Sequence, residues 1–125
     1  MFTRMLRCFF LSMTALIFAS AAVADKADVI DVKVKKIEAG KYEFHVTVNH
    51  WDDGWDHYAN SWRVLEPGGK VLGTRKLAHP HVEEMPFTRS KVIAVPEDVT
   101  SVIVQAGDLV HGFGGKEMTV KLPPN

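Results

Sequence analysis

The sequence predicts an all-β protein, an antiparallel sandwich of the immunoglobulin or fibronectin type with about seven strands. Three observations predict this class. Short segments alternate apolar and polar residues with a period of two, the pattern of a half-buried strand. Turn signals rich in glycine and proline separate these segments at intervals of roughly 8–12 residues. The chain beyond residue 24 has 101 residues, enough for one domain with its own core. A small closed barrel is the alternative architecture.

Residues 1–24 have the features of a secretory signal peptide. Two arginines lie near the start, residues 8–18 are apolar, and residues 22–24 (AVA) form a small-residue cleavage motif. The apolar stretch is shorter than the roughly 20 residues that span a bilayer. We therefore expect cleavage after Ala24 and a periplasmic or secreted mature protein, residues 25–125, with no membrane span.

Composition excludes several classes of protein. Cys8 is the only cysteine and lies in the predicted signal peptide, so the mature chain has no disulfide, zinc–thiolate site, blue-copper site or cysteine nucleophile. Without Arg4 and Arg7 the chain keeps 13 basic and 15 acidic residues, a net charge of −2. The lack of a basic excess argues against nucleic acid as a partner. No GxSxG, HExxH or phosphate-loop motif occurs, and we expect a non-enzymatic protein.

Four strands are expected in the first part of the mature chain. Glycine-containing turns separate the first strand from the second, around Gly40, and the third from the fourth, at residues 67–70. Trp62 lies on the third strand, where a sandwich of this type commonly buries a tryptophan. The expected strands cover residues 29–37, 42–48, 61–66 and 71–77.

Three further strands are expected in the second part, at residues 87–95, 101–106 and 117–122. Residues 96–98 (PED) are a turn, and residues 107–115 form a glycine-rich loop.

Alternate connections of such a sandwich lie at the same end, so three unusual loops are predicted to meet. They are residues 51–60 (WDDGWDHYAN), 78–87 (AHPHVEEMPF) and 108–116 (DLVHGFGGK). The connections at the opposite end are short, ordinary turns. The polar side chains expected at the rim are His50, Asp52, Asp53, Asp56, His57, His79, His81, Glu83, Glu84, Asp108 and His111, with Met85 packing beneath them.

Neutral imidazole and carboxylate groups suit Cu(II) or Zn(II). His79 and His81 flank a proline, and extended residues two apart share a face, so both rings are expected to point toward one ion. His57 and His111 arrive from separate loops, and Glu84 is a ligand or orients an imidazole. These five residues are the predicted metal site of a carrier or sensor. In the alternative interpretation, the histidines only order the loops through hydrogen bonds.

The segment WDDGWDHY suggests a different function. Trp51, Trp55 and Tyr58, with Asp56 between them, have the composition of a surface that binds a glycan or a periplasmic protein without any metal. Alternatively, the aromatic rings fold back as a small satellite core that stiffens the loop. A metal-dependent enzyme with an open coordination position is a third interpretation.

The chain resembles other proteins over nearly all of its mature part. Three segments carry the resemblance: GWDHYANSWRVLEPGGKVLGTR, HPHVEEMPFTRS and VIVQAGDLVHGFGGK. The chain resembles a group of small secreted bacterial proteins that share these phrases after a signal peptide. The resemblance implies a stand-alone periplasmic domain. It supplies no activity and no site residues.

Overall fold

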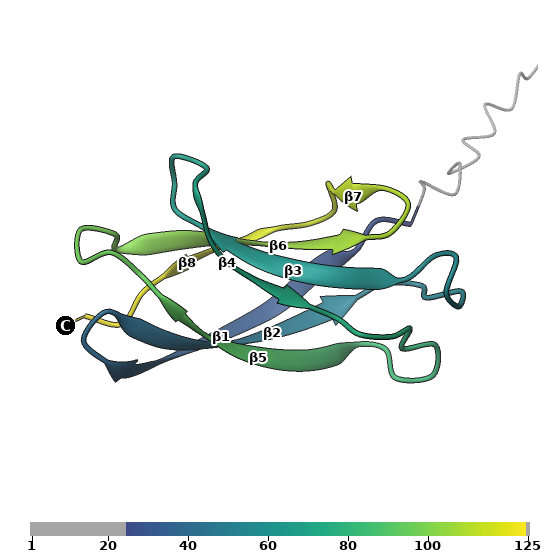
Figure 1. Cartoon of the computed structure of the whole chain (residues 1–125), viewed down its shortest axis with the longest axis horizontal. Coiled ribbons are helices and arrows are strands. Elements are labelled where there is room, and N and C mark those ends of the chain that lie inside the picture. Colours follow the sequence, from purple (N-terminus) through teal and green to yellow (C-terminus); the bar gives the residue numbers. More distant parts are fainter. Residues whose placement is uncertain (1–24, 125) are drawn as a thin grey trace, which may run out of the picture.

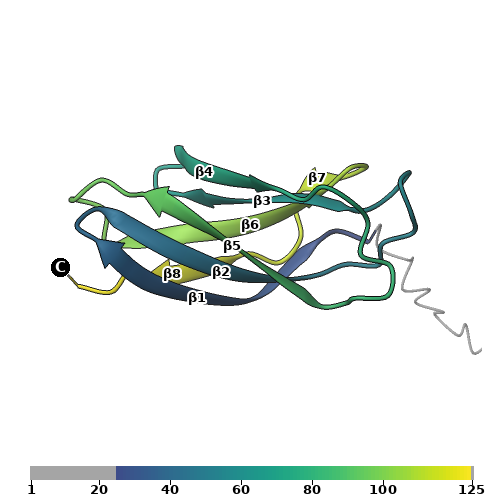
Figure 2. The ribbon, with the colours of Figure 1, turned by 60° about the horizontal axis from the view of Figure 1, so that its bottom comes forward.

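The computed structural model describes residues 25–124 and shows two antiparallel β-sheets packed face to face (Figures 1 and 2). The predicted signal peptide lies outside the described residues. Within the described range, no helix has the length and apolar character needed to cross a membrane. Residues 25–124 form eight strands: β1 (Asp28–Glu38), β2 (Lys41–Asn49), β3 (Ala59–Leu65), β4 (Val71–Lys76), β5 (Phe87–Ala94), β6 (Ser101–Asp108), β7 (Gly112–Phe113) and β8 (Met118–Lys121).

The chain crosses between the two sheets after β2, β4 and β5. The smaller sheet has the order β1-β2-β5. In the larger sheet β4, β3 and β6 are neighbours, and both β7 and β8 pair with the other edge of β6. All these pairings are antiparallel. The predicted all-β sandwich is therefore confirmed, with strand bounds close to the expected ones.

Alternation along the strands builds the core. β2 buries every second residue, from Tyr42 to Val48, and β6 does the same with Val102, Val104 and Ala106. Trp62 of β3 is fully buried, as predicted. Burying one large apolar side chain stabilises a fold by about 1.5–3 kcal/mol, so these inward faces hold the two sheets together.

The two ends of the sandwich differ as the sequence predicts. The end with the β1–β2, β3–β4 and β5–β6 connections has short turns, and Gly40 and Gly69 adopt φ values of 75° and 95° there, which favour glycine. The opposite end holds the β2–β3, β4–β5 and β6–β7 loops, together with Asp25 at the start of the described chain (Figure 1). We call this end the loop rim.

The glycine-rich segment after β6 is more regular than expected. It folds into a tight hairpin in which Gly107 and Asp108 of β6 pair with Phe113 and Gly112 of β7. Gly112 has a φ of 64°, a conformation that a residue with a side chain rarely adopts. This hairpin brings Asp108 and the residues after it back over the loop rim.

Gly115 allows the start of β1 to pass close to the β7–β8 connection. A Cβ atom at Gly115 would overlap the carbonyl oxygen of Ala27, and the neighbouring Val29 N–H donates to Lys116 O at 2.8 Å. We expect Gly115→Ala to lower the free energy of unfolding by about 1–3 kcal/mol, since backbone must shift to relieve the overlap. Urea denaturation measures the change. Gly68→Ala is the matched control, because nothing lies within 4 Å of its added Cβ; equal losses in both variants would contradict the packing argument.

Candidate metal centre

Asp52 connects three segments of the loop rim. Its side chain is fully buried. Oδ1 accepts hydrogen bonds from His50 Nδ1 at 2.6 Å and from the N–H of Ala59 at 2.8 Å, and Oδ2 accepts from the N–H of His81 at 2.7 Å. One carboxylate therefore joins the end of β2, the start of β3 and the β4–β5 loop.

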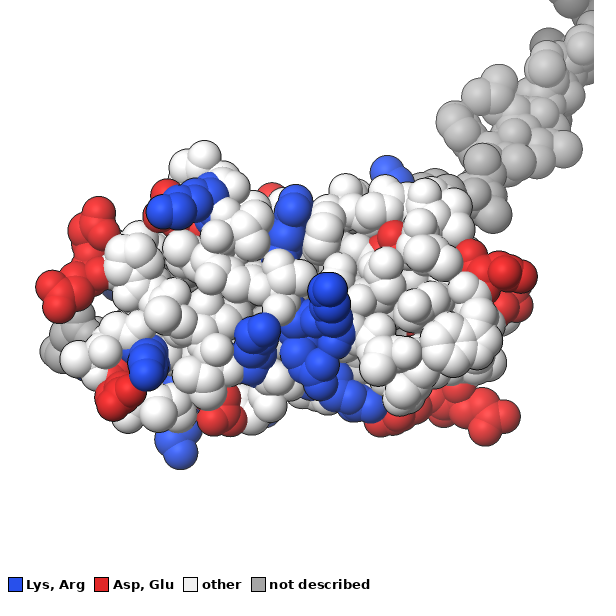
Figure 3. Space-filling model, in the orientation of Figure 1, with Lys and Arg blue, Asp and Glu red and all other residues white. Residues whose placement is uncertain are grey.

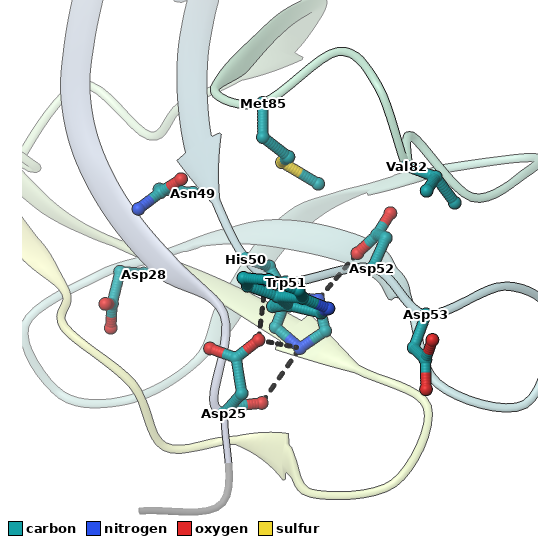
Figure 4. Close-up of a pocket in the computed structure, with 9 residues that line it drawn as sticks. All are labelled: Asp25, Asp28, Asn49, His50, Trp51, Asp52, Asp53, Val82 and Met85. Atoms are coloured by element: carbon teal, nitrogen blue, oxygen red, sulfur yellow. Dashed lines mark hydrogen bonds and ion pairs between the residues drawn. The ribbon is translucent and has the colours of Figure 1, made fainter. Parts of the chain in front are cut away.

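Asp52 also orients the ring of His50. Because the carboxylate accepts, Nδ1 of His50 carries a proton and Nε2 points away toward the rim. Nε2 lies 2.8 Å from the carbonyl oxygen of Asp25, and Figure 4 shows this contact. It also lies 3.3 Å from Nε2 of His57. A carboxylate that accepts from one ring nitrogen is the usual arrangement behind a metal-ligating histidine. Nε2 of His50 thus either donates a second proton to Asp25 or presents its lone pair to a cation.

Asp108 is the second buried carboxylate of the rim. Its Oδ1 accepts from the N–H groups of His111 and Val110 at 2.8 and 2.9 Å, and lies 2.9 Å from His111 Nδ1 and 3.1 Å from His57 Nε2. Burial raises the pKa of Asp108, but the hydrogen bonds from His111 and Val110 outweigh it and leave the pKa below its ordinary value. Asp108 is therefore negatively charged at neutral pH. Within residues 25–124, its buried Oδ2 has no hydrogen-bond partner.

Two imidazoles and the carboxylate of Asp108 converge at the loop rim. His50, His57 and Asp108 each offer one ligand atom, and these atoms all lie within 4.8 Å of one another. They come from the end of β2, the β2–β3 loop and the end of β6. The ring of His57 meets the rings of His50 and His111 edge to face, with centroids 4.8 and 5.0 Å away. We call His50, His57 and Asp108 the histidine–aspartate cluster.

The charge of this region suits a cation. The ion-pair partners of Asp52 are His50 and His81, and those of Asp108 are His57 and His111. With neutral imidazoles, only N–H donors stabilise the two buried carboxylates, so a positive charge beside them would be favourable in a low-dielectric interior. Protonated imidazole and a bound metal ion are the two sources of such a charge. Acidic side chains lie at both ends of the molecule in Figure 3, including the right-hand end, where the rim loops lie.

The predicted site residues separate into two groups. His57 and His111 both contact Oδ1 of Asp108. His79 and His81 pack against each other instead, with ring centroids 4.5 Å apart, and Phe87 stacks on the other side of His81 at 3.9 Å. Glu84 is exposed and pairs with Arg89 at 3.4 Å.

Arg89 makes the second group a poor cation site. Its Nη2 lies 3.1 Å from His81 Nε2 and donates to it, which occupies the lone pair that a metal would need. Burial, then the charges of Arg89 and His79, lower the pKa of His81, while Glu84 and Asp52 act in the opposite direction. His81 is therefore a neutral ring held by stacking and hydrogen bonding.

The aromatic side chains of the β2–β3 loop do not fold back as a satellite core. Trp51 and Trp55 are 77% and 66% exposed, so that interpretation is wrong for both. Tyr58 is half-buried and meets the edge of Trp55 at 5.7 Å, and Asp56 is exposed. Trp55 lies within a backbone turn that the Asp53 N–H closes on His57 O at 2.8 Å, and Trp51 precedes this turn.

A pocket of about 560 Å³ opens beside His50 (Figure 4). Trp51 and Val82 line it, and Met85 packs against the hydrophobic core at its side, as the sequence suggested. The remaining lining residues are polar: Asp25, Asp28, Asn49, Asp52 and Asp53.

The sequence predicts that His50 and Asp108 lie at the rim, but the predicted set of metal ligands includes neither of them. Asp25 is also absent from that set. One local signal was available, since an aspartate two residues after a histidine at a strand end can orient its ring. The meeting of His50 with His57 and Asp108 depends on the hairpin after β6, which no local pattern indicated.

The comparisons with known proteins found one relevant relative. A protein of Halomicrobium mukohataei named "Putative lipoprotein" is 45% identical to this chain over 95 residues, which is 76% of this chain and 47% of that protein. The chain thus spans about half the length of the curated relative it matches. No family model matches the chain, and no solved structure matches it.

Asp52→Asn tests the role of the buried carboxylate. The amide of Asn has one acceptor oxygen, and its NH₂ group would face an N–H group that donates to Asp52 in the wild type. We therefore expect a loss of about 2–4 kcal/mol in the free energy of unfolding. Asp53→Asn is the matched control, because Asp53 is the exposed neighbour and its change removes the same charge. Urea denaturation measures both variants. Equal effects would show that charge alone matters.

His81 should make the fold sensitive to mild acid. Its folded pKa is below the ordinary value of 6.5, so from about pH 6.5 downward the unfolded chain binds the proton more readily. Stability is then full above that pH and declines as pH falls toward the folded pKa. We expect the stability of His81→Phe, which keeps an aromatic ring, to fall less between pH 7.5 and about pH 5 in urea denaturation. His79→Phe controls for ring stacking; parallel profiles of wild type and His81→Phe would contradict the assignment.

Proposed function

We propose that this chain is a periplasmic, non-enzymatic domain that binds one divalent transition metal ion, Cu(II) or Zn(II), as a carrier or sensor. The proposed ligands are His50, His57 and Asp108. His111 lies beside them and pairs with Asp108 at 2.9 Å. The observation that carries the proposal is the convergence of two imidazole nitrogens and a buried carboxylate from three separate segments.

The chemistry of the ligands supports Cu(II) or Zn(II). Imidazole nitrogen with one carboxylate oxygen is a typical donor set for either ion, and hard cations such as Ca²⁺ prefer oxygen ligands alone. Asp52 behind His50 fixes the ring orientation, and Oδ2 of Asp108 accepts no hydrogen bond from residues 25–124. The ligands come from the rigid ends of β2 and β6 and from an ordered turn, which lowers the entropy cost of binding.

The periplasmic location rests on two observations. The first 24 residues have the features of a signal peptide. The relative from Halomicrobium mukohataei is named as a lipoprotein, a class of protein found outside the cytoplasm, although this chain covers only 47% of it. The near-neutral charge and the lack of catalytic motifs support a small binding domain rather than a nucleic-acid-binding protein or an enzyme.

The exposed tryptophans support a second candidate function. Trp51 and Trp55 present large apolar surfaces to solvent beside Asp56 and Tyr58. Such rings commonly bind a flat ligand or a protein partner. In this alternative the rim is a metal-free module for a glycan or a periplasmic protein, and binding is indifferent to a chelator.

Metal binding is tested with the tag-free protein purified from the periplasm without chelator. We expect stoichiometric metal by elemental analysis and tight Cu(II) or Zn(II) binding when the stripped protein is titrated. His57→Ala should weaken binding at least about 100-fold, since it removes a ligand. His79→Ala is the matched control, because His79 is exposed and belongs to the other histidine pair. Loss of binding in His79→Ala but not in His57→Ala would move the site to residues 79–84. No metal and weak binding throughout would favour the aromatic surface.

A further inference from the structure

Asp25 lies directly against the ligand nitrogen of His50. Its carbonyl oxygen is 2.8 Å from His50 Nε2, and its carboxylate Oδ2 is 3.6 Å from the same nitrogen. The Oδ2 atom also accepts a hydrogen bond from the N–H of Trp51. Figure 4 shows the backbone and the side chain of Asp25 both directed at this point. Asp25 therefore surrounds the His50 nitrogen with two of its own oxygens.

The residues that follow hold Asp25 in this place. Ala27 is fully buried, and Val29 donates its N–H to Lys116 O at 2.8 Å. Asp28 Oδ1 accepts from the N–H of Lys116 at 2.7 Å. The chain that enters β1 is thus tied to the β7–β8 connection, and Asp25 is preorganised beside the histidine–aspartate cluster.

The chemistry of the Asp25 nitrogen depends on the expected cleavage after Ala24. In the precursor this nitrogen belongs to the peptide bond with Ala24, and amide resonance withdraws its lone pair. Cleavage converts it into a primary amine, whose ordinary pKa of about 7.7–8.0 allows a metal ion to displace its proton. Only the Cα and carbonyl carbons separate this nitrogen from the oxygen that contacts His50, so both atoms can bind one ion in a small chelate ring.

We propose that the α-amino group of Asp25, released when the signal peptide is removed, is a ligand of the metal centre. This inference rests on the proposed metal-binding function and adds a ligand to it. The donor set becomes the amine and an oxygen of Asp25, the imidazoles of His50 and His57, and the carboxylate of Asp108. Such a set of nitrogen and oxygen donors suits the tetragonal geometry of Cu(II).

The centre is then complete only in the processed protein. A precursor that still carries its leader has an amide where the ligand should be, so it binds the ion more weakly. Metal loading is thereby coupled to export, because the enzyme that removes the leader also creates the ligand.

The test compares proteins that differ only at their ends. One begins at Asp25, a second keeps Ala24 as an N-terminal extension, and a third begins at Asp25 and has one alanine added after Asn125. Cu(II) is the probe, measured by competition with a chromophoric chelator and by the nitrogen couplings in electron paramagnetic resonance. We expect the N-terminal extension, which moves the α-amine one residue away from His50, to weaken Cu(II) binding at least about 10-fold and to change the nitrogen couplings. The C-terminal alanine should change neither.

Two further proteins separate ligand loss from other effects. Processed protein acetylated at its α-amine blocks the same atom with fewer added atoms, and should bind as weakly as the extended form. A synthetic peptide of residues 25–30 reports the affinity of a free N-terminus alone. Urea denaturation without metal compares the stability of the extended and processed proteins.

The outcomes distinguish this inference from the proposed function. Equal, tight Cu(II) binding by the processed, extended and acetylated proteins would overturn the role of the amine and leave the histidine–aspartate cluster standing. Binding no tighter than the peptide in all proteins would overturn the proposed function, and the amine ligand with it. A mass of the exported protein that places its N-terminus elsewhere than Asp25 would also overturn the inference.

Discussion

The loop rim depends on the buried carboxylate of Asp52. It accepts hydrogen bonds from His50, from the backbone of Ala59 and from the backbone of His81. These partners belong to both sheets and to the loop between β4 and β5. A charged acceptor with several N–H donors is among the stronger polar arrangements in a protein interior, because each donor would otherwise be buried unpaired. This one acceptor thus fixes the β2–β3 and β4–β5 loops relative to each other.

The two pairs of histidines show how context decides the role of an imidazole. His81 lies between the rings of His79 and Phe87 and accepts a hydrogen bond from Arg89, which occupies its lone pair. The positive charge of Arg89 would also repel a metal ion at this place. His50 has the opposite surroundings, with a carboxylate behind it and oxygen atoms of Asp25 in front. Histidine is thus structural in the β4–β5 loop and a candidate metal ligand at the end of β2.

The exposed tryptophans and the histidine–aspartate cluster share the same end of the sandwich. Trp51 follows His50 directly in the chain and donates its backbone N–H to Asp25. A partner that covered these indoles would bind at the end of the sandwich that holds the cluster. The metal-binding and partner-binding interpretations are compatible in a carrier, which has to pass its ion to another protein.

The sequence by itself determined the sandwich, the bounds of most strands and the grouping of three unusual loops at one end. Period-two alternation and glycine or proline turns are local signals, so strands such as 42–48 and the burial of Trp62 could be predicted from them. Which rim residues meet was decided only by the tertiary structure. His50, His57 and Asp108 are separated by up to 58 positions and converge because β2 and β6 end, and β3 begins, at the same end of the sandwich, and a short hairpin follows Asp108. The separation of His79 and His81 from this cluster has the same cause, since Arg89 reaches their loop from β5 and no spacing within the loop could reveal it.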